Sequence, residues 1–100
     1  FEIVYSGTSY SPNTLVIETD DTVKFVNRSA TDMWPASAMH PTHKAYPTTG
    51  GCIGSTFDAC VGIKPDQSWS FTFDKMGSWN FHDHLNPSAL GTVNVVTVLR

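Results

Sequence analysis

The sequence predicts an all-β fold, a Greek-key β-sandwich or barrel of about seven to eight strands. Short segments rich in β-branched and aromatic residues alternate with clusters of turn-forming residues, and no segment keeps the apolar period of an amphipathic helix. The chain has 100 residues, which is enough to enclose one hydrophobic core and too few for two. We therefore expect one domain over residues 1–100.

The turns between the expected strands contain residues suited to them. Ser11-Pro12-Asn13 and Lys64-Pro65-Asp66-Gln67 combine the fixed φ angle of proline with side chains that can bond their own backbone. Thr19-Asp20-Asp21 relies on the same side-chain bonding, and Lys75-Met76-Gly77 on the conformational freedom of glycine. The strands delimited in this way are residues 2–5, 14–18, 22–27, 33–38, 68–73, 78–82 and 92–99.

The composition is that of an ordered chain with no affinity for nucleic acid. It is 40% hydrophobic, 12% aromatic and only 15% charged, so burial of apolar surface can offset the entropy of ordering. The formal net charge is −3, and no run of Lys or Arg forms the positive stripe that nucleic acid requires. No stretch approaches the roughly 20 apolar residues of a membrane span.

Residues 41–62 interrupt the strand rhythm and predict a long loop braced by a disulfide. Cys52 and Cys60 lie in its glycine-rich part, where a bond between them would close the most flexible segment. Two free thiols or metal ligands are the alternatives, but the spacing fits neither a CxxC redox pair nor a zinc knuckle. Within the loop, residues 56–60 could form one helical turn. Because disulfides persist mainly outside the cytosol, and the chain begins at Phe1, we expect a periplasmic or secreted protein.

The four histidines form two tight pairs, His40-Pro41-Thr42-His43 and His82-Asp83-His84. Imidazole is the commonest transition-metal ligand, and pairs on two loop edges can meet at one end of a sandwich. In an extended segment His82 and His84 face the same way, whereas Asp83 faces the side shared with Trp79 and Phe81, at the rim of the core. This clustering predicts a metal site, and Cu²⁺ binds nitrogen ligands more strongly than Zn²⁺, which remains the alternative.

Other readings of these residues are more ordinary. Any single histidine is better explained as a solvated loop residue. Met39 could bind Cu(I) through its thioether, although packing is the commoner role of such a methionine. Trp34 could stack near the site, although an aromatic residue in a sandwich is by default a core residue. No serine triad, paired catalytic carboxylates or phosphate-binding loop stands out, so no catalytic residue is assigned and hydrolase chemistry has no support.

Residues 77–87 (GSWNFHDHLNP) followed by 91–95 (GTVNV) resemble the copper-binding end of cupredoxins, and especially of multicopper oxidase domains. The first histidine pair is similar to the His-Pro-x-His segment of those domains. The resemblance implies a cupredoxin-like fold, with His40 at the blue-copper histidine position and His43, His82 and His84 at type 2 and type 3 positions. Asp83 stands where the blue-copper cysteine would be, so the thiolate that makes a blue site conduct electrons is absent.

Three functions follow from these expectations. The first is an exported protein that handles or carries copper at a mononuclear, type 2-like histidine site, with a redox or copper-acceptor protein as its partner. The second is electron transfer, which the fold favours and Asp83 opposes. The third is a small copper redox enzyme, which the site chemistry favours less. Asp83 is either an oxygen ligand or, as we favour, an acceptor that holds a histidine N–H.

Overall fold

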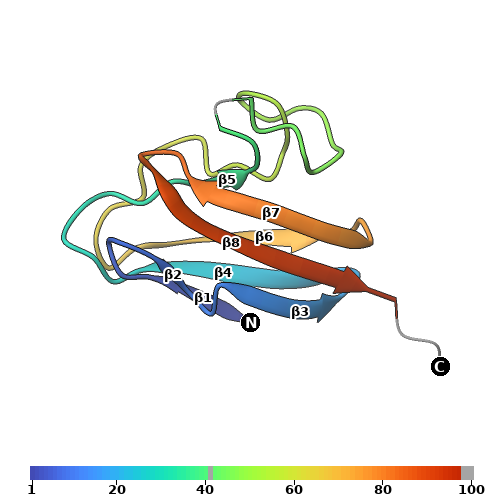
Figure 1. Ribbon diagram of the computed structural model, residues 1–100, viewed down its shortest axis with the longest axis horizontal. Coiled ribbons are helices and arrows are strands. Elements are labelled where there is room, and N and C mark those ends of the chain that lie inside the picture. Colours follow the sequence, from blue (N-terminus) through green and yellow to red (C-terminus); the bar gives the residue numbers. More distant parts are fainter. Residues whose placement is uncertain (41, 98–100) are drawn as a thin grey trace.

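The computed structural model describes residues 1–40 and 42–97, which form two four-stranded β-sheets packed face to face (Figure 1). The first sheet has the strand order β2-β1-β4-β6, and the second has the order β3-β8-β7-β5. Their bounds are β1 Glu2–Tyr5, β2 Tyr10–Ser11, β3 Thr14–Glu18, β4 Asp21–Asn27, β5 Pro35–Ser37, β6 Ser68–Phe73, β7 Gly77–Asp83 and β8 Asn86–Val96.

The strand pairing is that of a Greek-key sandwich. β1 lies parallel to β4 and β3 lies parallel to β8, while the other neighbouring strands are antiparallel. A parallel pair needs a connection that leaves the sheet, so the chain crosses between layers instead of returning in a hairpin. The predicted all-β class and sandwich architecture are therefore confirmed. In the described ranges the structure contains no helix, and hence none that could cross a membrane.

Most predicted strands are found, with shifts at their ends. β1, β3 and β6 have the predicted bounds, and β4 begins one residue early. β7 gains a residue at each end, β5 is shorter than residues 33–38, and Met33 instead forms an isolated bridge with Ile63. β2 was not predicted, because two residues give no alternation to read.

The last strand differs most from its prediction. β8 begins at Asn86 and ends at Val96, whereas residues 92–99 were expected, and residues 98–100 lie outside the described part of the chain. The tight turn after β7 pairs Asn86 with Asp83, and the register resumes at Leu90 opposite His82 after an irregularity between His82 and Asp83.

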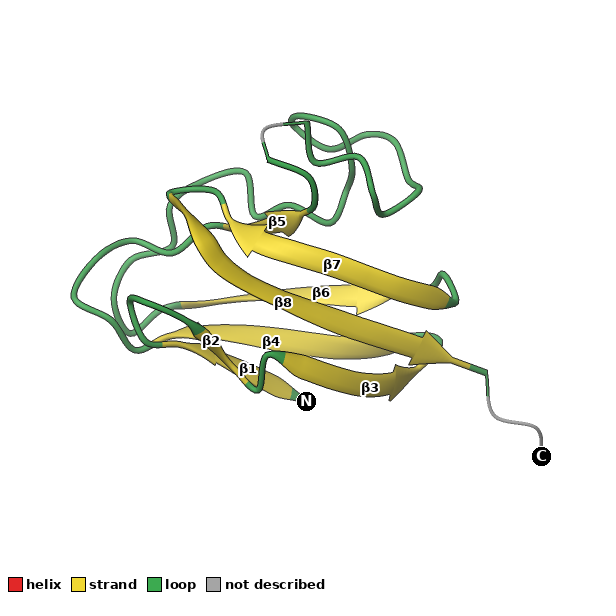
Figure 2. Ribbon diagram, in the orientation of Figure 1, coloured by secondary structure: helices red, strands yellow, loops and turns green. Residues whose placement is uncertain are grey.

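The long segment between β5 and β6 folds over one end of the second sheet (Figure 2). Its expected helical turn at residues 56–60 is absent; Asp58 forms a bridge to Ala36 there. Two aromatic side chains from this segment, Tyr46 and Phe57, are fully buried. The Phe57 ring lies 4.8 Å from that of Phe73, between centroids, so the segment contributes to the core it covers.

Tyr46 also has a polar anchor. Its hydroxyl donates a hydrogen bond of 2.8 Å to Oδ1 of Asp74, and accepts one of 3.0 Å from the backbone N–H of the same residue. Burial and this carboxylate raise the pKa of Tyr46 to about 12, so the phenol keeps its proton. The loop is thus tied to the β6–β7 turn as well as to the core.

Asp83, at the end of β7, is fully buried on the inner side of the second sheet, together with Phe81. Its Oδ1 accepts a hydrogen bond of 2.8 Å from the hydroxyl of Tyr10 in β2 and one of 2.6 Å from the backbone N–H of Trp34. Burial, followed by the Asp83 carboxylate, raises the pKa of Tyr10. The buried Asp83 carboxylate therefore joins the two sheets and also holds the backbone of Trp34, the residue before β5.

Replacing Tyr10 with Phe tests this junction. The variant loses a buried hydrogen bond to a carboxylate, so we expect the free energy of unfolding to fall by about 1.5–3 kcal/mol in urea denaturation of the metal-free protein. Tyr5→Phe is the matched control, because the buried Tyr5 hydroxyl donates only a 3.2 Å bond to the carbonyl of Gly7 and should cost about 1 kcal/mol or less. A larger loss from Tyr5→Phe would contradict this account.

Candidate metal centre

The strand pairing brings the two histidine pairs together. β5 lies antiparallel to β7 with Ala36 opposite His82, and the chain leaving β5 then turns back across the outer face of β7. Backbone hydrogen bonds close this turn: the His43 N–H donates to the Met39 carbonyl at 2.7 Å, and the Ala45 N–H to the Ala38 carbonyl at 2.8 Å. The loop histidines are thus held above the strand histidines.

Four ring nitrogens converge on one point. His43 Nε2 lies 3.1 Å from His82 Nε2 and 3.1 Å from His84 Nδ1. His40 Nδ1 lies 3.3 Å from His82 Nε2. One nitrogen from each ring lies within 4.8 Å of the corresponding nitrogens of all the others. The structure therefore brings all four predicted histidines into one cluster, formed by His40, His43, His82 and His84.

The spacing fits a single small cation. Two imidazole nitrogens at about 2.0 Å from an ion, separated by a tetrahedral angle, lie about 3.3 Å apart. The measured 3.1–3.3 Å separations between neighbouring rings match that edge. Without a cation, lone pairs of facing nitrogens repel unless protons are shared between them. The donor set is imidazole alone, which suits copper and zinc and lacks any thiolate.

Asp58 holds one of these histidines, and the sequence analysis did not identify it. His43 Nδ1 donates to Asp58 Oδ2 at 2.8 Å, and both side chains are completely buried. A histidine whose Nδ1–H is taken up by a carboxylate presents the lone pair of Nε2, the nitrogen that faces the cluster. The other oxygen, Oδ1, accepts hydrogen bonds of 2.6 Å from Trp34 Nε1 and 2.8 Å from the Cys60 backbone N–H.

The disulfide supports this carboxylate. Cys52 and Cys60 are bonded, as predicted, and closing such a short ring is worth about 2–3 kcal/mol in chain-entropy models. Because the Cys60 N–H bonds Asp58, the disulfide constrains the residue that orients His43. The only sequence signal for Asp58 was an aspartate two residues before an available N–H, a pattern common to many turns.

Trp34 belongs to the site, contrary to the expectation that it is an ordinary core residue. It is half-buried, and its ring centroid lies 4.4 Å from that of His84, with the planes 42° apart. Its backbone carbonyl accepts a 2.7 Å hydrogen bond from the His84 N–H. Through its indole N–H to Asp58 it also reaches His43, so one residue orients ligands from both pairs.

Asp83 lies on the opposite side of β7 from the cluster. The hydrogen bonds that the structure gives it join it to Tyr10 and Trp34, and none joins it to a histidine ring. Its Oδ2 is buried without a hydrogen-bond partner in the described structure. Alternation along the strand thus separates Asp83 from His82 and His84.

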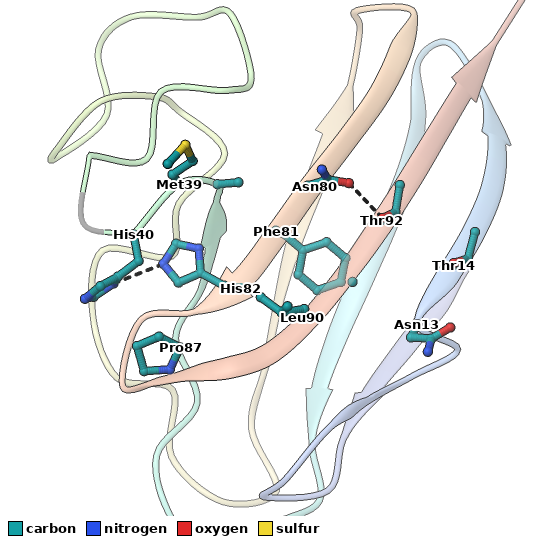
Figure 3. A pocket seen from close by; sticks show the side chains of 12 residues that line it. Asn13, Thr14, Met39, His40, Asn80, Phe81, His82, Pro87, Leu90 and Thr92 are labelled. Carbon is teal, nitrogen blue, oxygen red and sulfur yellow. Dashed lines mark hydrogen bonds between the residues drawn. The ribbon is translucent and has the colours of Figure 1, made fainter.

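A hollow of about 540 Å³ opens beside the cluster on the outer face of the second sheet (Figure 3). His40 and His82 form one side of it, and Pro87 and Leu90 lie along another. Met39 also lines this hollow, and 72% of its surface is exposed, so it is not the packing residue that was expected. The cluster is therefore closed on the Asp58 side and open on the His40 side.

Burial keeps the strand histidines neutral. Burial first, and then the charge of the three other imidazoles, lowers the pKa of His82 to about 4. Burial and two neighbouring imidazoles also lower the pKa of His84. Neutral rings have free lone pairs, so these residues are ready to act as ligands at neutral pH.

Comparison with solved structures identifies the architecture. An oxidised amicyanin mutant superposes with a TM-score of 0.73 at 20% identity, over 96% of this chain and 81% of that one. A reduced amicyanin mutant gives 0.72 at 22% identity and the same coverages. A purple cupredoxin from Nitrosopumilus maritimus gives 0.71 at 17% identity, over 95% of this chain and 98% of that one. The chain has the cupredoxin fold.

This result confirms the fold that the sequence resemblance implied. No protein-family model matches the chain, and no curated protein matches it significantly. At these identities the cupredoxin fold is what the likeness establishes, and the chemistry of the site has to be argued from the histidine cluster itself.

The metal-free protein should lose stability as the pH is lowered. The pKa of His82 is 6.5 in the unfolded chain and about 4 in the folded protein. Between these values the unfolded state binds more protons, so the free energy of unfolding falls with falling pH and this contribution levels off below about pH 4. Urea denaturation at a series of pH values measures it. His82→Gln removes the titrating ring while other acids still titrate, so an unchanged pH slope in that variant would exclude His82 as the cause.

Proposed function

We propose that this protein binds one copper ion at His40, His43, His82 and His84 and carries or buffers copper outside the cytosol. The observation that supports the proposal is the convergence of four imidazole nitrogens, with neighbouring rings 3.1–3.3 Å apart, on a cupredoxin scaffold. Among divalent first-row ions, Cu²⁺ binds such nitrogen sites most strongly. Some of the similar amicyanin structures are of the Cu(I) form.

The four proposed ligands differ in how many contacts hold their side chains in place. His43 is fixed by Asp58, and His82 is buried in β7, an inner strand of its sheet. His84 is held by the Trp34 ring and carbonyl, whereas His40 is exposed on the loop. Three fixed ligands and one accessible ligand suit a site from which metal can be passed on. When bound, copper would supply a centre that changes oxidation state by one electron.

Copper handling is favoured over electron transfer because of the missing thiolate. The two cysteines are joined in the loop disulfide, and Asp83 faces away from the cluster, so no sulfur–copper bond of the blue type is available from cysteine. Electron transfer remains the second candidate, since a preformed ligand cage restrains geometry in both oxidation states. The optical spectrum and the redox potential of the copper-loaded protein distinguish the two.

The disulfide also supports the proposed location. Cys52 is exposed, so the bond is open to cellular thiols and would persist in the periplasm or outside the cell. A copper-acceptor or redox protein is the partner that we propose, approaching from the open His40 side. This partner would take the ion without displacing the buried residues that orient His43.

Removing His84, the ligand that directly follows β7, should nearly abolish copper binding. We expect about one Cu²⁺ per wild-type chain at neutral pH, with a type 2 spin-resonance signal and no strong thiolate absorption. His84→Ala should lower the affinity by more than about 100-fold, because a direct ligand matters more than the groups that orient ligands. Leu85→Ala, which changes the adjacent exposed turn residue, is the control and should bind as the wild type does. Equal affinities in the wild type and His84→Ala would exclude this site.

The two buried aspartates provide a matched pair of tests. Asp58→Asn removes the carboxylate that orients His43, so copper affinity should fall about 10–100-fold. Asp83→Asn alters a carboxylate whose described hydrogen bonds go to Tyr10 and Trp34 and not to a histidine ring, so it should lower the stability while changing the affinity of the folded protein far less. Competitive copper titration and urea denaturation of both variants separate the effects. A greater loss of affinity in Asp83→Asn would reverse the assigned roles.

A further inference from the structure

The open side of the histidine cluster contains one group that the copper proposal has not used, the thioether of Met39. Its side chain is 72% exposed and lines the same hollow as His40 and His82. Figure 3 shows Met39 beyond the His82 ring, with its sulfur turned away from the two histidine rings. Single exposed apolar side chains are common at protein surfaces, so this exposure shows only that the sulfur is accessible and is not used in packing.

The backbone of Met39 is fixed although its side chain is not. Its carbonyl accepts the 2.7 Å hydrogen bond from the His43 N–H, so Met39 and His43 belong to one closed turn. The side chain has three rotatable bonds and a polarizable sulfur atom, and it extends from this anchored position. A sulfur ligand from Met39 would have to reach the histidines by rotation of this side chain, since the backbone is held in the turn.

The other sulfur atoms of the chain are unsuitable. Met33 is fully buried in the core, and the sulfur of Met76 accepts a 3.3 Å hydrogen bond from Thr97 at the far end of β7. Cys52 and Cys60 are bonded to each other. Since the chain has three methionines and two cysteines, Met39 is the only sulfur donor at the cluster.

We propose that the open face of the cluster is a binding site for the cuprous ion, at which Met39 joins His40 and His82 as a thioether ligand. The inference rests on the proposed copper function and specifies the oxidation state exchanged there. Thioether sulfur is a soft ligand that selects Cu(I), whereas the buried imidazoles also bind Cu²⁺. Pro87 and exposed Leu90 border the same hollow, and apolar surroundings favour the ion of lower charge.

Met39 also lies in a different part of the fold from the axial methionine of a blue-copper site. It belongs to the turn that follows β5, whereas the sequence region in which a blue site has its axial methionine contains Ser88 and Leu90, in β8. The site would therefore combine a largely buried nitrogen set with an exposed sulfur ligand. Cu(I) would enter and leave through the Met39 side.

The test compares Met39→Leu with Met76→Leu, the same substitution at a second exposed methionine. Copper is reduced with ascorbate, which spares the disulfide, and Cu(I) affinity is measured by competition with a coloured Cu(I) chelator. Cu²⁺ affinity is measured separately. We expect Met39→Leu to lower Cu(I) affinity at least about tenfold, the low end of the loss when a group supporting a metal is removed, and to leave Cu²⁺ affinity nearly unchanged. Met76→Leu should change neither affinity.

X-ray absorption at the copper edge provides an independent readout. The Cu(I) form of the wild type and of Met76→Leu should show a sulfur neighbour, and the Cu(I) form of Met39→Leu should show nitrogen neighbours only. Absence of sulfur from the wild-type spectrum, or equal Cu(I) affinities in Met39→Leu and Met76→Leu, would overturn the inference while leaving Cu²⁺ binding by the histidines intact. Failure of the wild type to bind either ion would overturn the proposed function as well.

Discussion

The Asp58 carboxylate connects the residue before β5, the histidine turn and the disulfide loop. It accepts hydrogen bonds from the His43 ring, the Trp34 indole and the Cys60 backbone. Hydrogen bonds offset the cost of burying this carboxylate, and because all three donors converge on it, each partner also helps to fix the position of the other two. The tautomer of His43, the position of the Trp34 ring against His84 and the course of the disulfide loop all depend on this one group.

The long loop is therefore part of the core and of the site together. Phe57 is fully buried among the aromatic side chains, and the next residue, Asp58, reaches the metal cluster. The sequence predicted correctly that this loop is irregular, but it attributed the bracing of the loop to the disulfide alone. The disulfide closes only the segment between Cys52 and Cys60, whereas Tyr46 and Phe57 anchor the loop by burial. Anchoring of this kind positions the ligands before any ion binds.

The strands and the histidine pairs could be predicted because their signals are local. Alternating β-branched and aromatic residues define β1, β3 and β6, and the separation of His82 from His84 by one residue places both rings on one face. Asp58 could not be predicted, because its role depends on donors from Trp34, His43 and Cys60 that only the folding of the long loop against β5 brings together. β2 was missed because its two residues carry no periodic pattern.

Long-range pairing also explains why the sequence favoured packing roles for Trp34 and Met39, with a place near the site only as the alternative. Trp34 has the composition signal of a core residue, and only the β5–β7 register puts its ring against His84. Met39 follows a buried strand, which suggested packing, but the backbone turns sharply there and directs its side chain outward. In both cases the position of the side chain depends on the pairing of β5 with β7, a strand that is distant in sequence.

The register between β5 and β7 makes the site sensitive to the insertion or deletion of a single residue in these strands. β5 has only three residues, and its pairing of Ala36 with His82 aligns the loop histidines with those of the strand. Inserting or deleting one residue before His82 would exchange the two faces of the strand end. The imidazoles would then enter the apolar interior, and the Asp83 carboxylate would emerge where they had been. Variation in length is therefore far more restricted in this strand than in the exposed turns, and natural or engineered insertions should occur in pairs or be confined to those turns.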